Sequence, residues 1–120
     1  MTMRFDDAAF ALIEVGHRLD ARGWAPATAG NYSVRLDDGS VAVTISGKHK
    51  GRLTTADFMR VDLEGRALTP GKPSAETGLH LALYRAFPET NAVLHGHSPQ
   101  AVGLSRAVPD ATEWVFRGHE

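Results

Sequence analysis

The chain contains no cysteine among its 120 residues. This absence excludes disulfide bonds, and it also excludes thiolate ligands for a metal. Any bound metal ion must therefore be held by histidine, aspartate or glutamate side chains. A chain without cysteine also suits a reducing compartment, so we expect a cytoplasmic protein.

A strong charge of one sign and a long apolar run are absent as well. Lysine and arginine together number 13, aspartate and glutamate number 14, and the formal net charge is -1. This balance disfavours nucleic acid and anionic membranes as partners. No apolar run approaches the ~20 residues of a membrane-spanning helix, and residues 1–7 lack the apolar segment of a secretory signal. With 42% apolar residues, the composition predicts a single globular domain.

Hydrophobic periodicity predicts an α/β protein with a mainly antiparallel sheet. Residues 5–22 carry apolar residues at the helical period, and Ser74 is placed to cap a second helix ending near Phe87. Alternating runs at 31–36 and 41–45 flank an Asp-Asp-Gly-Ser turn, which predicts a β-hairpin. Further strands are expected at 58–63, 92–95 and 114–116, with a helix from Ser98 to Ser105. Helices and strands in this order form a layered domain.

Two histidines at a strand end are the first candidates for chemistry. His95 and His97 are separated by Gly96 and follow the apolar run 92–94, which we expect to be buried. Side chains two apart on a strand point to the same face, so both imidazoles can reach one metal ion. The alternative is a pair of surface histidines without a ligand.

A catalytic zinc site usually takes three protein ligands, so the histidine pair is incomplete. Glu76, expected in the first turn of the second helix, is a candidate third group. The alternative is a first-turn glutamate stabilised by the helix dipole, and the sequence by itself favours this alternative. His80 lies one turn further on, and we expect it to be a partly exposed helix residue rather than a ligand.

Three loops carry groups that can bind an anion. They offer backbone amides, hydroxyls and an amine. The residues concerned are Gly30 and Asn31, then Ser46, Gly47 and Lys48, then Ser74. No P-loop or GxGxxG pattern is present, so nucleotide binding by those routes is not supported. For Lys48 and Lys50 the alternative is a solvated turn.

Four segments together resemble the methylthioribulose-1-phosphate dehydratases of the class II aldolase/adducin superfamily. They are Gly-Trp-Ala-Pro-Ala-Thr with Gly-Asn-Tyr-Ser at 23–33, Thr-Ile-Ser-Gly-Lys-His-Lys-Gly at 44–51, Lys-Pro-Ser-Ala-Glu-Thr at 72–77 and Val-Leu-His-Gly-His-Ser at 93–98. They occur in the family's order and at its approximate spacing, and the match covers essentially the whole chain. The Ser-Gly-Lys-His-Lys-Gly stretch is what looks specific to the dehydratases.

The resemblance implies a role for each matching residue. His95 and His97 would be two of three zinc-binding histidines, with one zinc ion per subunit. Glu120 matches the family's acid/base glutamate, and Glu76 matches the catalytic glutamate of the related aldolases. The substrate's phosphate and hydroxyls would be bound by Gly30, Asn31, Ser46, Gly47 and Ser74. Gly96 departs from the threonine usual in this family, and we expect little effect because the position faces away from the metal.

The resemblance also implies a fold and a reaction. The fold would be a three-layer αβα domain, truncated at the C-terminus because the third histidine of the family lies beyond this chain. The reaction would be zinc-dependent dehydration of 5-methylthioribulose 1-phosphate to 2,3-diketo-5-methylthiopentyl 1-phosphate in methionine salvage, by a homotetramer. The alternatives are another class II sugar-phosphate aldolase or epimerase, and an inactive fragment or adducin-like binding module.

Overall fold

A four-stranded antiparallel sheet forms the centre of the protein in the computed structural model, which describes residues 3–113 and 115. The strand order is β3-β2-β1-β4, with every neighbouring pair antiparallel. The strands are β1 (Asn31–Arg35), β2 (Val41–Thr44), β3 (Phe58–Val61) and β4 (Ala92–His95). The predicted hairpin is confirmed as β1 and β2, and the mainly antiparallel sheet is confirmed too. The strand expected at 114–116 falls largely on residues outside the described part.

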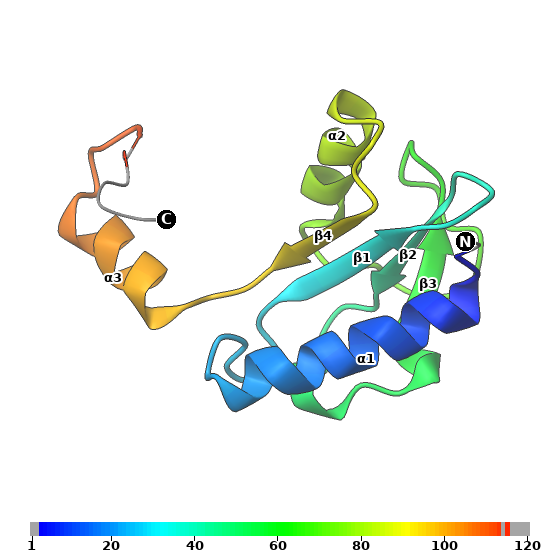
Figure 1. Cartoon of the computed structure of the whole chain (residues 1–120), viewed down its shortest axis with the longest axis horizontal. Helices are drawn as coiled ribbons and strands as arrows, with labels where there is room; N and C mark the ends of the chain where they lie inside the picture. The colour runs from blue at the N-terminus through cyan, green and yellow to red at the C-terminus, as the bar shows by residue number, and fades with distance from the viewer. Residues whose placement is uncertain (1–2, 114, 116–120) are drawn as a thin grey trace.

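Within the described residues, three α-helices accompany the sheet, and their arrangement is drawn in Figure 1. They are α1 (Phe5–Ala21), α2 (Thr77–Ala86) and α3 (Pro99–Ala107), with short 3-10 turns η1 (Lys50–Arg52) and η2 (Thr55–Asp57) before β3. Figure 1 shows α3 standing away from the sheet beyond the extended segment that follows β4. The predicted cap of this helix is confirmed, because the Ser98 side chain accepts a hydrogen bond from the Ala101 amide.

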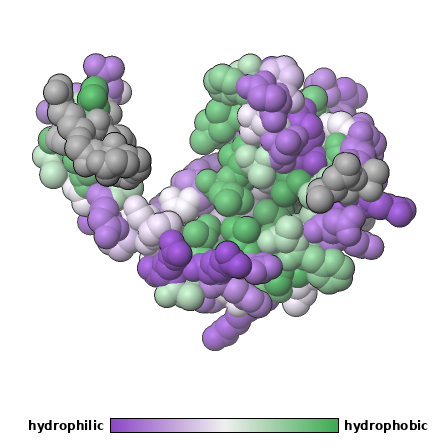
Figure 2. Space-filling model, viewed as in Figure 1, coloured by the Kyte–Doolittle hydropathy of each residue, from purple (hydrophilic) through white to green (hydrophobic). Residues whose placement is uncertain are grey.

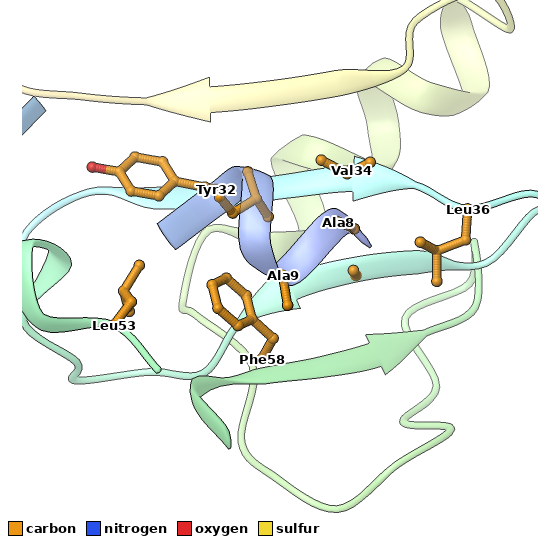
Figure 3. Packing of buried hydrophobic residues seen from close by; sticks show 9 residues of the cluster. Ala8, Ala9, Tyr32, Val34, Leu36, Leu53 and Phe58 are labelled. Carbon is orange, nitrogen blue, oxygen red and sulfur yellow. The ribbon is translucent and has the colours of Figure 1, made fainter. Parts of the chain in front are cut away.

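One face of the sheet is covered by α1. Its helical apolar stripe places Ala8, Ala9 and Leu12 against alternate residues of the strands, including Tyr32 and Phe58. Figure 3 shows the labelled members of this cluster, among them Ala9, Tyr32 and Phe58, meeting between the helix and the strands. At Gly16 the helix approaches the backbone of Lys50 so closely that an added Cβ would collide with its carbonyl oxygen.

The opposite face carries a second apolar cluster beneath α2. It consists of Val41, Val43, Met59, Val61, Leu81 and Tyr84, all buried. Because strand side chains alternate, Ala42 joins the α1 cluster while its neighbours on β2 join this one. The sheet therefore separates two small cores.

Strand β4 differs from the expectation of burial. Leu94 is 48% exposed, and Ala92 is exposed as well. Within the described residues β4 is one of the two edge strands of the sheet, so it has a hydrogen-bonded neighbour on one side only. Figure 2 shows apolar surface over the middle of this view, where β4 lies in Figure 1.

In the described part of the chain, no helix is long and apolar enough to cross a bilayer.

Candidate metal and substrate site

A cleft of about 240 Å³ lies where the ends of β1 and β4 meet the loops before β1, after β2 and before α2. Its lining consists of Thr28, Ala29, Gly30, Asn31, Ser46, Gly47, Lys50, Ser74, Ala75, Glu76, His95 and His97. Eight of these are residues that sequence reasoning selected, namely Gly30, Asn31, Ser46, Gly47, Ser74, Glu76, His95 and His97. Segments more than 60 residues apart in the sequence are thus brought to one site.

Strand register explains how the histidines reach the cleft. Asn31 and His95 are direct partners in the antiparallel β1–β4 pair, so their side chains lie on the same face. The His95 and His97 rings lie with their centroids 4.7 Å apart and their planes at 43°. The His97 amide donates to the Trp24 carbonyl at 2.6 Å, which fastens the segment after β4 to the loop before β1.

Glu76 lies beside the histidine pair. Its Oε2 is 2.6 Å from His95 Nδ1, and Asn31 Nδ2 lies 3.2 Å from the same ring nitrogen. Glu76 is the N-cap residue of α2 and therefore precedes the helix, whereas the sequence placed it in the first turn. Its carboxylate is about half exposed, so the group is open to the cleft.

The donor set suits zinc, but it lacks a complete set of ligands. Two imidazoles and a carboxylate are groups that zinc accepts. Among residues 3–113 and 115, however, no group of three or more histidine, cysteine, aspartate or glutamate side chains is arranged to hold a metal. The described residues therefore bring two imidazoles and one carboxylate together without completing a set of metal ligands.

The loops predicted to bind an anion are shaped by glycines with positive φ and by hydrogen bonds. Gly30 has φ +88°, and a Cβ there would lie 3.1 Å from the His95 carbonyl oxygen, so a side chain would be strained. Gly47 also has a positive φ, of +81°. The predicted capping role of Ser74 is wrong: its hydroxyl donates to the Thr44 carbonyl at 2.7 Å and thereby ties the loop to the end of β2.

The two lysines of the second loop occupy different environments. Lys48 does not line the cleft, and its Nζ lies 3.5 Å from Asp57 Oδ1. Lys50 is 1% exposed and donates to the carbonyls of Thr28 at 3.0 Å and Lys48 at 2.6 Å. Burial lowers the pKa of the Lys50 ammonium. The solvated-turn alternative is therefore wrong for Lys50, which sequence reasoning missed as a cleft residue.

The expectation that His80 is partly exposed is also wrong. The side chain is 1% exposed and makes hydrogen bonds with Asn31 Oδ1 at 2.5 Å and Ser33 Oγ at 2.6 Å. Burial, and then the nearby His95, lower the pKa of His80 to about 4, although Glu76 acts in the opposite direction. The only signal in the sequence is the spacing of the polar residues. Asn31 and Ser33 are two apart on a strand, and His80 and Tyr84 are four apart on a helix, so each pair lies on one face of its element.

One predicted residue falls outside the described part of the chain. Glu120 lies beyond the described residues, so its position relative to the cleft does not enter the geometry of the site.

A larger cavity of about 600 Å³ runs along α3. Apolar residues such as Leu104 and Val108 line it, together with Ser98 and Glu113. Of the described residues, none that was selected from the sequence as a ligand or acid/base group lies there. The residue types that line the two cavities therefore favour the smaller cleft as the functional site.

Similarity to known proteins agrees with this geometry. Residues 10–117 match the family described as Class II Aldolase and Adducin N-terminal domain. The chain belongs to this family. A relative from Methylococcus capsulatus named methylthioribulose-1-phosphate dehydratase is 56% identical over 107 residues, which cover 89% of this chain and 52% of the relative.

Solved structures show the same fold. YgbL from Klebsiella pneumoniae superimposes with a TM-score of 0.81 at 30% identity, over 98% of this chain and 53% of YgbL. The L-fuculose-1-phosphate aldolase of Thermus thermophilus has a TM-score of 0.70 at 42% identity, over 79% of this chain and 49% of the aldolase. The chain thus spans about half the length of these class II aldolase relatives.

Proposed function

We propose that the chain supplies the metal- and phosphate-binding part of a methylthioribulose-1-phosphate dehydratase. The enzyme would remove water from 5-methylthioribulose 1-phosphate and release 2,3-diketo-5-methylthiopentyl 1-phosphate, a step of methionine salvage. The observation that carries this proposal is the single cleft shared by His95, His97 and Glu76 with the glycine-bearing loops. The 56% identity to a protein of that name supports the choice of reaction.

His95 and His97 are the proposed zinc ligands, with one ion per subunit and a third ligand, in our proposal a histidine, from outside this chain. Zinc, when bound there, supplies Lewis-acid polarisation of the substrate's ketone. The chain's own contribution is to hold both imidazoles in the cleft at the ends of β1 and β4. The Trp24 carbonyl does this by accepting from the His97 amide.

Two glutamates are the proposed acid/base groups. A carboxylate of Glu120 takes the proton from the carbon beside the ketone, and the hydroxyl on the next carbon leaves with a returned proton as water. The resulting enol then becomes the second ketone by moving its proton from oxygen to carbon. Glu76, in contact with His95, faces the same substrate and can hold a proton during the exchange.

The substrate's phosphate and hydroxyls would be held by the loops that line the same cleft. Gly30, Gly47, Ser46, Asn31 and Ser74 contribute backbone and side-chain donors there. Lys48 was expected to add the positive charge, but we assign that role to Lys50, because Lys50 lines the cleft and Lys48 does not. Fixing the phosphate positions the reacting carbons beside the histidines.

Assembly and location complete the proposal. By resemblance to the family, we propose a three-layer αβα domain in a cytoplasmic homotetramer. The absence of cysteine in all 120 residues supports the cytoplasmic assignment.

A sugar-phosphate aldolase is the second candidate. The 42% identity to an L-fuculose-1-phosphate aldolase favours it, together with the contact between Glu76 and His95. An aldolase would cleave a carbon–carbon bond, whereas a dehydratase releases water and leaves the carbon chain intact. The products therefore discriminate between the two.

The test is a product assay on the full-length protein. Formation of the diketone from methylthioribulose 1-phosphate, with no cleavage of fuculose 1-phosphate, is the expected result. Glu120→Gln should retain zinc while kcat falls by at least roughly 100-fold. Cleavage of fuculose 1-phosphate in preference to turnover of methylthioribulose 1-phosphate would identify the protein as an aldolase. Turnover of neither substrate would favour a binding module.

A further inference from the structure

A row of four polar side chains crosses the buried space between α2 and β1. Asn31 and Ser33 are two apart on β1, and His80 and Tyr84 are four apart on α2. Both spacings place each pair on one face of its element. All four side chains are buried, with Asn31 the most exposed at 7%.

Consecutive members of the row are joined by hydrogen bonds. His80 Nε2 lies 2.5 Å from Asn31 Oδ1, and His80 Nδ1 lies 2.6 Å from Ser33 Oγ. Ser33 Oγ lies 2.8 Å from the Tyr84 hydroxyl. At the far end, Arg35 stacks over the Tyr84 ring at 4.9 Å and donates to the Tyr84 carbonyl. The row is therefore anchored at the end away from the cleft.

Hydrogen-bonding rules give this row a direction. An amide oxygen only accepts, so His80 Nε2 must carry a proton and donate to Asn31 Oδ1. Burial favours the neutral ring, which leaves Nδ1 as an acceptor of the Ser33 hydroxyl proton. Ser33 has then used its only proton, so it accepts from the Tyr84 hydroxyl. Every donor in the row points toward Asn31.

The direction of these hydrogen bonds determines which atom of the Asn31 carboxamide faces the cleft. With its oxygen occupied by His80, the Asn31 carboxamide presents Nδ2 to the cleft, 3.2 Å from His95 Nδ1. If the amide were reversed, an oxygen would face the same space. An N–H donor and an oxygen acceptor have opposite effects on a developing negative charge.

We propose that His80 is a positioning residue whose Nε2–H fixes the Asn31 carboxamide with its N–H donor facing the cleft. The inference rests on the proposed function, because removing a proton beside a ketone places negative charge on oxygen. A preoriented donor stabilises that charge more in the transition state than in the bound substrate. His80 thus acts through Asn31 and touches no reacting atom.

Two substitutions separate orientation from packing. In His80→Gln the side-chain amide nitrogen replaces Nε2 and keeps a donor to Asn31. In His80→Asn the shorter amide replaces the Nδ1 side and keeps only the contact with Ser33. We expect His80→Asn to lower kcat by roughly 10- to 100-fold with KM changed much less, and His80→Gln to recover most of that loss.

A double-mutant cycle tests whether the effect passes through Asn31. In an Asn31→Ala background, His80→Asn should lower kcat no further, because the carboxamide that it positions is gone. Equal losses in the two His80 variants, or an undiminished loss in the Asn31→Ala background, would overturn the proposal. Urea unfolding of each variant identifies any loss that follows stability alone.

A measurement independent of turnover decides the same question. Long-range proton–nitrogen NMR spectra of the ¹⁵N-labelled protein identify which ring nitrogen of His80 is protonated. The expected result at neutral pH is the Nε2–H tautomer. The Nδ1–H tautomer would overturn the proposal, because Asn31 would then turn its oxygen to the cleft. If the protein lacks dehydratase activity, the proposed function fails and the tautomer still tests the orientation.

Discussion

The two faces of the sheet are built from the same strands but differ in chemistry. The face under α1 is apolar along the helix, with Ala8 and Leu12 packed on Phe58. The face under α2 is apolar only toward β3, and toward the cleft it becomes polar at Ser33 and His80. Apolar burial stabilises the first face, whereas hydrogen bonds compensate the desolvation of the second.

The contrast extends to the satisfaction of polar atoms. On the α2 face the polar row leaves no member without a partner. On the α1 face the Tyr32 hydroxyl is buried with no hydrogen-bond partner among the described residues. Burial, and then Asp20, raise the pKa of Tyr32 to about 12. We infer that the α1 face tolerates one unsatisfied group, while the α2 face is organised to orient a side chain in the cleft.

The largest expected effect is on the apolar face. Leu12→Ala removes a side chain that is 2% exposed, and it should lower the free energy of unfolding by about 3 kcal/mol. Urea unfolding measures this loss, and the zinc content of the folded protein should be unchanged. A loss below about 1 kcal/mol would contradict a close-packed α1 face.

On the polar face, stability should depend on pH through His80. Its pKa falls from 6.5 to about 4 on folding, so the folded state binds fewer protons between these values. The contribution of the neutral His80 ring to the free energy of unfolding is complete above pH 6.5 and is lost as the pH falls toward 4. The total loss is roughly 3 kcal/mol. Urea midpoints across this range measure it. His80→Gln, which cannot titrate, should show a correspondingly flatter profile, and an unchanged profile would refute the assignment.

A smaller effect is expected at the far end of the polar row. Tyr84→Phe removes the hydroxyl near Ser33 while keeping the ring beneath Arg35. It should lower the free energy of unfolding by about 1 kcal/mol, because one buried hydrogen bond is lost. Activity should remain close to that of the parent, since His80 still holds Asn31. A loss of kcat equal to that of His80→Asn would show that the whole row is needed.

The smallest effect is expected on the solvent side of α1. Arg18 and Glu14 form an ion pair at 2.8 Å, and their side chains are 74% and 67% exposed. Arg18→Ala should change the free energy of unfolding by less than about 0.5 kcal/mol. This variant is the control for Leu12→Ala on the same helix, and a comparable loss would remove the distinction between the buried and exposed sides.

Local patterns predicted most of the backbone. The helical period of residues 5–22 and the Asp-Asp-Gly-Ser turn correspond to α1 and to the β1–β2 hairpin. Ser98 caps α3 as expected. Ser74 failed as a cap because its hydroxyl is used by the Thr44 carbonyl, which lies 30 residues away and leaves no local signal.

The site was predicted only in part, because some of its residues have local sequence signals and others depend on long-range contacts. His95 and Glu76 could be selected because their spacing and family motifs are local, and the cleft does bring them together. Lys50 and His80 could not, because their burial depends on α1 approaching at Gly16 and on α2 packing over β1. Leu94 was expected to be buried from its apolar neighbours, yet it belongs to neither apolar cluster and is 48% exposed.

The most direct test of the account is the metal content of the purified protein. Elemental analysis of the full-length protein should find zinc near one ion per chain, and its double variant His95→Ala/His97→Ala should lose the zinc while remaining folded. Leu12→Ala serves as a destabilised control that should keep the metal. Zinc retained by the double variant, or no zinc in the parent protein, would contradict the assignment of this cleft as the metal centre.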